Sequence, residues 1–225
     1  MNDIASQNIA VKIIDPQNVA LEPAQQTLTA DQLYDLFRSD SYALLASLMA
    51  APADHKLLQW LQQIELDDNQ NSQMHQAWSV LQLAASRADA AQIEEEYQQL
   101  FIGIGRGELV PFGSWYLTGF LMEKPLVQLR MDLQRLGFER DPDVCEPEDH
   151  IAALCEVMAV MANPVEGFSR SDIEGFYNQN LGCWVQRFFV DLQNAKNAHF
   201  YSAVGRFGEI FAGMENLYLE PEKVF

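Results

Sequence analysis

The sequence predicts an all-α protein, a compact multi-helix bundle of about ten helices in two lobes joined by a hinge. Apolar residues recur three or four positions apart along most of the chain, which is the spacing of one face of a helix. No stretch of any length alternates apolar and polar residues as a half-buried strand would. Proline, glycine and clustered polar residues interrupt the pattern at intervals, and these interruptions mark the connections between helices.

Start and stop signals place the individual helices. Thr29 and Gln32 resemble a capping box, in which a side chain and a backbone group at the helix start satisfy each other. Pro52 and Asp54 introduce the second helix, and Gly137 is placed to end a later one in a left-handed conformation. The expected helices cover residues 29–48, 54–64, 74–83, 90–101, 114–122, 125–136, 147–161, 171–194 and 199–217.

The clearest irregular loop is the stretch 103–113, which contains four glycines and a proline. A second connection, through Asp141 and Pro142, is the expected meeting point of the two lobes. The predicted division is a lead over 1–28 whose order the sequence leaves open, an N-terminal lobe over 29–137, a hinge over 138–146 and a C-terminal lobe over 147–225.

The chain is strongly acidic, with a formal net charge of −18 and an isoelectric point near 4.4. Such a charge repels phosphate backbones and anionic lipid surfaces, so neither nucleic acid nor a membrane is an expected partner. A basic peptide would instead be attracted. The chain has no segment with the length and apolarity of a membrane span and no basic secretory region, so cytoplasmic localisation is expected. The three cysteines are odd in number and widely spaced, which argues against a disulfide framework or a zinc site.

Residues 146–150 read Glu-Pro-Glu-Asp-His and form the most informative stretch of the chain. An apolar helical pattern follows, so Pro147 suits the first position of a helix. Glu148 and Asp149 would then lie in the first turn, where the helix dipole favours negative charge. A well-built helix start explains everything in this stretch except His150. Acid/base chemistry and metal binding are the alternatives, but no nucleophile motif or further ligand supports either.

Two further segments invite interpretation. Tyr97, Leu100 and Phe101 fall on one apolar helix face, and the spacing alone favours packing in the core. The stretch 111–116 places three aromatic residues at a loop-to-helix junction, where Ser114 is an expected N-cap. A peptide-binding groove and plain packing explain these aromatics equally well. The glycine-rich stretch 103–107 lacks the lysine and the preceding strand that phosphate-binding loops need.

The order of these motifs resembles the TorD/DmsD family of redox-enzyme maturation chaperones, over about residues 30–215. The motifs that carry the resemblance are Glu-Tyr-Gln-Gln-Leu-Phe-Ile-Gly at 96–103, Pro-Phe-Gly-Ser-Trp-Tyr-Leu at 111–117, Pro-Leu at 125–126, Leu-Arg at 129–130, Leu-Gly at 136–137 and Glu-Pro-Glu-Asp-His at 146–150. Each motif is weak alone, and the combination is specific.

The resemblance implies a cytoplasmic, non-catalytic chaperone. Such proteins bind the twin-arginine signal peptide and the apo-form of a molybdopterin-dependent oxidoreductase, assist cofactor insertion and hold back export. It further implies that the protein holds no cofactor of its own, apart from weak guanine nucleotide binding in some members. A monomer is expected, with domain-swapped dimers formed through the hinge in some members. The motifs do not specify which molybdoenzyme is the cargo.

By match to the family motifs, the resemblance implies nine peptide-binding residues: Tyr97, Leu100, Phe101, Pro111, Phe112, Ser114, Glu146, Asp149 and His150. The family often has Tyr or Trp in place of Phe112, so a polar contact from that ring is absent here. The chemistry agrees, because arginine pairs with carboxylates through charge-assisted hydrogen bonds and the aromatic residues would receive an apolar stretch. The hypothesis for His150 is that it orients Asp149 or contacts the peptide backbone. A nucleotide hydrolase that uses the acidic cluster, or a purely structural helical adaptor, are the alternative functions.

Overall fold

The computed structural model describes residues 11–13, 28–66, 72–103, 106–140, 144 and 146–220. Within these residues the chain forms ten α-helices, one short π-helix (η1) and two three-residue strands, so the predicted all-α class is confirmed. The elements are β1 (Val11–Ile13), α1 (Ala30–Ala50), α2 (His55–Gln62), α3 (Gln73–Arg87), α4 (Ala90–Tyr97), η1 (Gln98–Ile102), α5 (Gly113–Thr118), α6 (Lys124–Arg135), β2 (Phe138–Arg140), α7 (Ile151–Ala162), α8 (Arg170–Asn180), α9 (Val185–Gln193) and α10 (Phe200–Tyr218).

Local capping signals fix several of these helices. The Thr29 hydroxyl accepts from the Gln32 N–H, and the Gln32 side chain accepts from the Thr29 N–H, so the predicted capping box is present at the start of α1. Asp54 caps α2 in the same way through the Leu57 N–H. Gly137 follows α6 with a φ of +84°, as predicted for a left-handed helix end.

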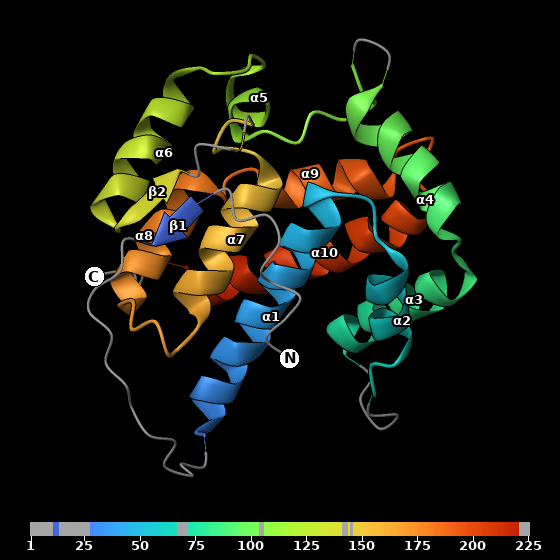
Figure 1. Ribbon diagram of the computed structural model, residues 1–225. Coiled ribbons are helices and arrows are strands. Elements are labelled where there is room, and N and C mark those ends of the chain that lie inside the picture. The colour runs from blue at the N-terminus through green and yellow to red at the C-terminus, as the bar shows by residue number, and fades with distance from the viewer. Residues whose placement is uncertain are drawn as a thin grey trace.

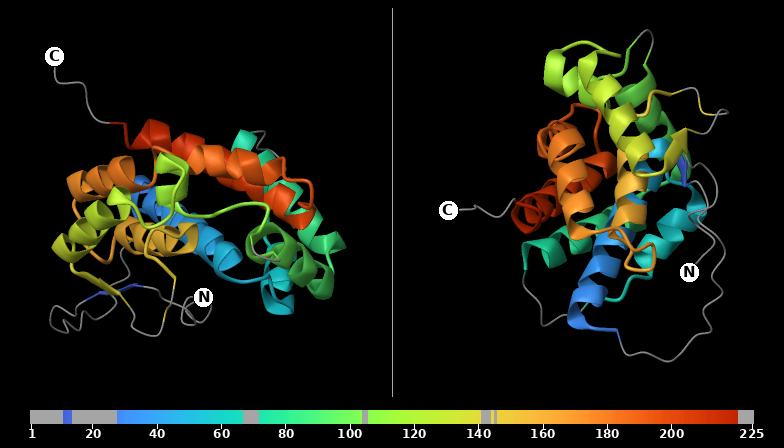
Figure 2. Two further views of the ribbon diagram at one scale, coloured as in Figure 1. Left: turned by 90° about the horizontal axis from the view of Figure 1, so that it is seen from above. Right: turned by 90° about the vertical axis from the view of Figure 1, so that its left-hand side faces the viewer.

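Helices α1 and α7 pack side by side at the centre of the molecule (Figure 1). Nine of the twelve residues of α7 are buried, which suits a helix surrounded by others. Helix α10 packs on α9 and α3 and extends the same core. Helices α5 and α6 lie at one end of the molecule, and α2, α3 and α4 lie at the other (Figures 1 and 2).

A buried ion pair ties α1 to α10. The Arg38 guanidinium donates from Nε to Oε1 of Glu215 at 2.7 Å and from Nη2 to Oε2 at 2.9 Å. The Tyr42 hydroxyl donates to Oε2 at 2.8 Å. The side chains of Arg38 and Glu215 are 1% and 0% exposed. The carboxylate therefore has three donors in a site closed to solvent, as a buried charge requires.

Three details differ from the sequence-based predictions. The helix expected over 171–194 is two helices, because the chain breaks over 181–184 and the indole N–H of Trp184 bonds to the Asn180 carbonyl. The helix expected over 114–122 ends at Thr118, since Gly119 adopts a left-handed conformation with a φ of +81°. Strand β2 lies inside the predicted hinge and pairs antiparallel with β1, so a small piece of sheet is present.

The buried core is one cluster that draws residues from both predicted lobes. The division into two lobes and the opening of a hinge over 138–146 stay predictions. Part of that segment, 141–143 and 145, lies outside the described residues, as do most of the lead 1–28 and the connector 67–71.

Candidate functional site

The structure joins the two motifs that the sequence singled out. The Gly113 N–H donates to the Asp149 carbonyl at 2.9 Å, and the Ile151 N–H donates to the Pro111 carbonyl at 2.9 Å. Phe112 and His150 therefore form an antiparallel bridge. Their rings meet edge to face, with centroids 4.9 Å apart. The loop before α5 and the segment before α7 make one unit, which we call the paired segment (residues 111–114 and 149–151).

His150, rather than Pro147, marks the start of α7. Its backbone is extended, and its Nδ1 accepts a hydrogen bond from the Ala152 N–H at 3.2 Å, so the imidazole is the N-cap. The His150 N–H bonds back to the Pro147 carbonyl at 3.1 Å and closes a turn. The prediction that Pro147 occupies the first helical position, with Glu148 and Asp149 in the first turn, is therefore wrong. All three residues precede the helix.

The acids displaced from the helix have other partners. Glu148 is 6% exposed and accepts two-pronged hydrogen bonds from the Arg130 guanidinium on α6, at 2.9 to 3.1 Å. Asp149 is 3% exposed, and its Oδ2 accepts from the Ser114 N–H at 2.8 Å. Asp149 thus caps the start of α5 from 35 residues away. The prediction of Ser114 as an N-cap is wrong, because Phe112 holds that position without a side-chain hydrogen bond.

Two polar atoms of the paired segment lack a hydrogen-bond partner. They are the second carboxylate oxygen of Asp149, Oδ1, and the hydroxyl oxygen of Ser114, Oγ, and both residues are buried. Buried polar groups are nearly always bonded, and an ionised carboxylate accepts several donors. These two oxygens are unmet acceptors of the paired segment, and both are closed to solvent in this structure.

Glu146 provides an accessible carboxylate beside this segment. Its side chain is 60% exposed, and its Oε2 lies 3.9 Å from His150 Nδ1. Partial burial against the protein raises the pKa of the Glu146 carboxyl. Burial, with a smaller contribution from the Glu146 charge, raises the pKa of Tyr97 to about 12, which places Tyr97 within electrostatic range of Glu146.

The three residues predicted to share one apolar helix face, Tyr97, Leu100 and Phe101, lie mainly in the core. Tyr97 is 7% exposed and donates from its hydroxyl to the Met49 carbonyl at 3.0 Å, and Leu100 is fully buried. Phe101 packs on the rings of Tyr97 and Tyr201, with centroids 4.9 and 5.5 Å apart, and is partly exposed. Packing accounts for Tyr97 and Leu100, as their spacing favours. A peptide contact from any of the three stays a prediction.

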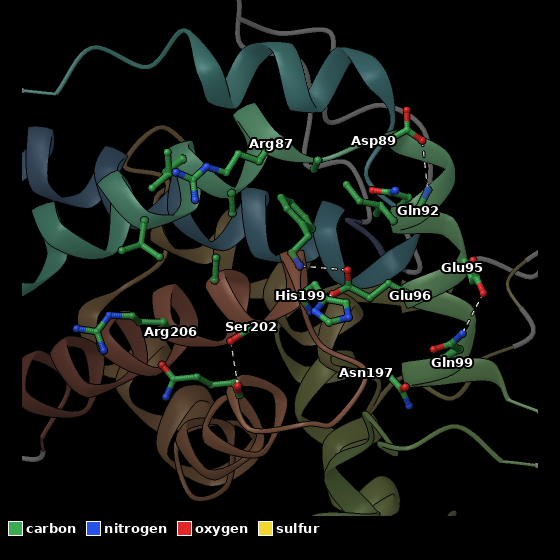
Figure 3. Close-up of a pocket in the computed structure, with 18 residues that line it drawn as sticks. Arg87, Asp89, Gln92, Glu95, Glu96, Gln99, Asn197, His199, Ser202 and Arg206 are labelled. Carbon is green, nitrogen blue, oxygen red and sulfur yellow. Dashed lines mark hydrogen bonds between the residues drawn. The ribbon is translucent and has the colours of Figure 1, made fainter.

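Sequence reasoning missed a cleft of about 730 Å³ between α3, α4 and α10. Its carboxylates are occupied: Asp89 caps α4, Glu95 accepts from Gln99, and Glu96 accepts from the N–H groups of residues 199–201 at the start of α10. Arg87 and Arg206 lie on the same side of the cleft, opposite Asp89 and Glu95 (Figure 3).

These two arginines are unusual for this chain. Every other arginine in the described part of the chain has an ion-pair or aromatic partner, and Arg87 and Arg206 have neither. Because they are 119 residues apart in sequence, only the fold reveals that they share a cleft. The cleft can therefore offer two guanidinium groups to an anion.

The described residues contain neither a cluster of metal ligands nor a membrane-spanning helix. No three His, Cys, Asp or Glu side chains among them are grouped to hold a metal ion. Over the same residues, no helix combines the length and the apolarity needed to cross a bilayer.

Comparison with known proteins identifies the family. The family model described as nitrate reductase delta subunit matches residues 67–190, more than half of the chain. The chain is 25% identical over 214 residues to the chaperone protein TorD of Shewanella pealeana, covering 84% of this chain and 92% of that protein. It is 31% identical over 116 residues to a protein assigned as the Tat proofreading chaperone DmsD of Haemophilus influenzae, covering 50% of this chain and 54% of that protein.

A crystal structure from Archaeoglobus fulgidus, assigned as a redox enzyme maturation protein, aligns with 88% of this chain and 99% of its own at a TM-score of 0.49 and 17% identity. The curated relatives are chaperones and not enzymes, which confirms the expectation of a non-catalytic protein. The chain therefore belongs to the nitrate reductase delta subunit family, the family of the TorD and DmsD chaperones of redox-enzyme maturation.

Proposed function

We propose that this protein is a cytoplasmic chaperone that binds the twin-arginine signal peptide and the apo-form of a molybdopterin-dependent oxidoreductase. In this proposal it assists cofactor insertion and holds back export until the cargo is mature. It acts as a monomer, and exchange of lobes at residues 138–146 is its route to a dimer. The observation that carries the proposal is the exposed Glu146 carboxylate beside the paired segment, in which two buried oxygens lack a hydrogen-bond partner.

The chemistry of a twin-arginine head fits this arrangement. A guanidinium presents five N–H donors in a planar fork and no acceptor. Glu146 offers an accessible carboxylate, and Asp149 and Ser114 have two buried oxygens without a hydrogen-bond partner, which a guanidinium reaches only if the paired segment shifts. Asp149 is already held by the Ser114 N–H, so its position is set before a peptide arrives. The net charge of −18 speeds encounter with a basic peptide, and binding weakens as salt rises.

The first prediction concerns the two acids. Glu146→Gln and Asp149→Asn should each weaken binding of a twin-arginine peptide by roughly tenfold, because each removes a charge-assisted hydrogen bond and leaves an amide in its place. Asparagine still offers an oxygen to the Ser114 N–H, so the cap on α5 survives. Titration calorimetry with the leader peptide of an oxidoreductase from the same genome measures the affinity.

The matched control is Glu139→Gln, which removes an exposed carboxylate from β2. A peptide with both arginines changed to lysine keeps its charge but loses the planar fork of guanidinium donors, and it should bind more weakly. Equal affinity for all variants would refute the assignment of the site, and absence of binding to any leader peptide would refute the proposed function. A structural adaptor would behave differently again, since its variants would lose stability and bind every partner as before.

The weak guanine nucleotide binding implied by family resemblance has a candidate location in the cleft of Figure 3. Phosphate groups pair with guanidinium groups, and Arg206 is partly buried without a partner. We expect Arg206→Gln to weaken GTP binding roughly tenfold in equilibrium dialysis. Lys56→Gln on α2 removes a positive charge outside the cleft and should leave GTP binding unchanged. If both variants bind GTP like the original chain, the nucleotide is bound elsewhere or not at all.

A further inference from the structure

An exposed apolar surface lies over α5, α6 and the turn between them. It consists of six large side chains, all at least 43% exposed, which we call the α5–α6 patch: Leu117, Phe120, Leu121, Met122, Val127 and Met131. Single exposed apolar residues are ordinary on a protein surface, but six within residues 117–131, on two helices that contact each other and the turn between them, favour an interaction site. Two of the six are methionines, whose flexible side chains adapt to varied apolar partners.

The turn that carries the patch has a strained backbone at one position. Met122 has a φ of +59°, and it is the only described residue other than glycine with a positive φ. A side chain in this conformation costs on the order of 1–2 kcal/mol relative to the right-handed region. Glycine would remove that cost, yet the chain holds a methionine there that is 70% exposed. The strain is explained if the exposed side chain is used for binding.

The patch continues into the proposed peptide site. Met122 and Val127 share the wall of a small cavity of about 140 Å³ with Pro147, and Arg130 also lines it. Pro147 directly follows Glu146, the exposed carboxylate, and Arg130 holds Glu148. A peptide bound at Glu146 can thus run over Pro147 onto α6, past Arg130 and Arg140, which both lie within 4.0 Å of the Glu148 carboxylate.

Two of the residues expected to receive the apolar stretch of a signal peptide lie in the core, while Phe101 and Phe112 are partly exposed. Tyr97 and Leu100 are buried, and Tyr97 is held by its bond to the Met49 carbonyl. An apolar peptide segment would have to displace core side chains there. The α5–α6 patch offers exposed apolar area of the same kind next to the same carboxylate.

We infer that the α5–α6 patch binds the apolar stretch of the twin-arginine signal peptide while Glu146 and the paired segment bind its basic head; this inference rests on the proposed function. A second copy of this chain is a poor occupant, because two chains that each carry a net charge of −18 repel each other. A peptide with a basic head and an apolar stretch matches both the charge and the surface.

A thermodynamic cycle tests the inference. One change is in the protein, Phe120→Ser with Met122→Gly, which removes exposed apolar area and relaxes the backbone. The other change is in the peptide, whose apolar stretch is replaced by serine and glycine while both arginines remain. Each change alone should weaken binding about tenfold, and the two together should weaken it little more than one alone, because they remove the same contact.

The control variant is Val165→Ser with Leu217→Ser. These residues are 84% and 77% exposed, lie outside the patch and should leave the affinity unchanged. A peptide with a photoreactive leucine in its apolar stretch should crosslink to residues 117–131. Crosslinks confined to residues 97–114, or fully additive effects in the cycle, would overturn the inference while the proposed function stands. A peptide that binds no variant, including the original chain, would overturn both.

Discussion

Replacing Glu215 by alanine is expected to lower the free energy of unfolding by about 3–5 kcal/mol. The substitution leaves the Arg38 guanidinium in a site where its side chain is only 1% exposed. It also removes the acceptor of the Tyr42 hydroxyl. Asp35 is the one charged partner left to Arg38, at 2.9 Å and at the partly exposed edge of the network. A buried charge with one partner lost costs far more than the ion pair contributes, because the charge cannot regain its hydration.

Urea unfolding at pH 7, followed by circular dichroism, measures this loss as a lower midpoint. The matched control is Glu174→Ala, which breaks the Arg170–Glu174 pair, in which the arginine side chain is 56% exposed. That change should cost less than about 1 kcal/mol. A double variant, Arg38→Met with Glu215→Leu, removes both charges and should recover most of the stability. A loss below that of the Glu174 control would contradict the role assigned to the buried pair.

This ion pair illustrates what the sequence could not provide. Arg38 and Glu215 are 177 residues apart, and each looks like one more charge on an amphipathic helix. Local signals performed well: the capping box at Thr29 and the left-handed Gly137 were predicted and are present. Such signals depend on residues three or four positions apart, which the chain itself holds together. Long-range pairing depends on the packing of α1, α7 and α10, which periodicity does not determine.

The candidate site shows the same limit in a different form. The sequence singled out two segments that the fold brings together, since Phe112, Ser114, Asp149 and His150 meet in the paired segment. The roles predicted for Glu148 and Asp149 were wrong, because an acid before an apolar run usually caps its own helix or interacts with the dipole of that helix. Here Asp149 caps α5 and Glu148 binds Arg130 on α6. The resemblance to a family indicated the segments, and only the geometry shows how they are bonded.

His150 is expected to make the protein less stable as the pH falls from about 6.5 to about 4. Burial lowers the pKa of its imidazole to about 4 in the folded state, against 6.5 as the ordinary value. The unfolded chain therefore takes up a proton in this range that the folded chain does not. By linkage, the free energy of unfolding keeps the full contribution of the neutral His150 above pH 6.5. Between pH 6.5 and pH 4 that contribution falls by about 1.4 kcal/mol per pH unit, to a total loss of about 3 kcal/mol.

The hydrogen bonds of His150 also indicate that its imidazole is neutral in the folded state, so acid should destabilise the fold. His150 Nδ1 accepts the N–H of Ala152, so this nitrogen is unprotonated and the proton lies on Nε2. Protonation at Nδ1 would break the cap of α7. The Glu146 carboxylate, 3.9 Å from Nδ1, favours the charged imidazole, but it is more than half exposed and burial of the ring outweighs it. The Glu146 and Glu148 carboxyls also titrate in acid, with their pKa values shifted in opposite directions, so the raw pH profile contains several groups.

The variant His150→Asn isolates the histidine. Asparagine is a strong N-cap residue and can accept from the Ala152 N–H, but it does not titrate. The difference in unfolding free energy between the original chain and the variant should therefore be nearly constant above pH 7 and should shrink by about 3 kcal/mol between pH 6.5 and pH 4. Urea unfolding at half-unit pH steps measures it, and the imidazole resonance of His150 reports its pKa directly. A difference that does not vary with pH would mean that the imidazole has the same pKa in the folded and the unfolded chain, which would contradict the effect of burial on His150.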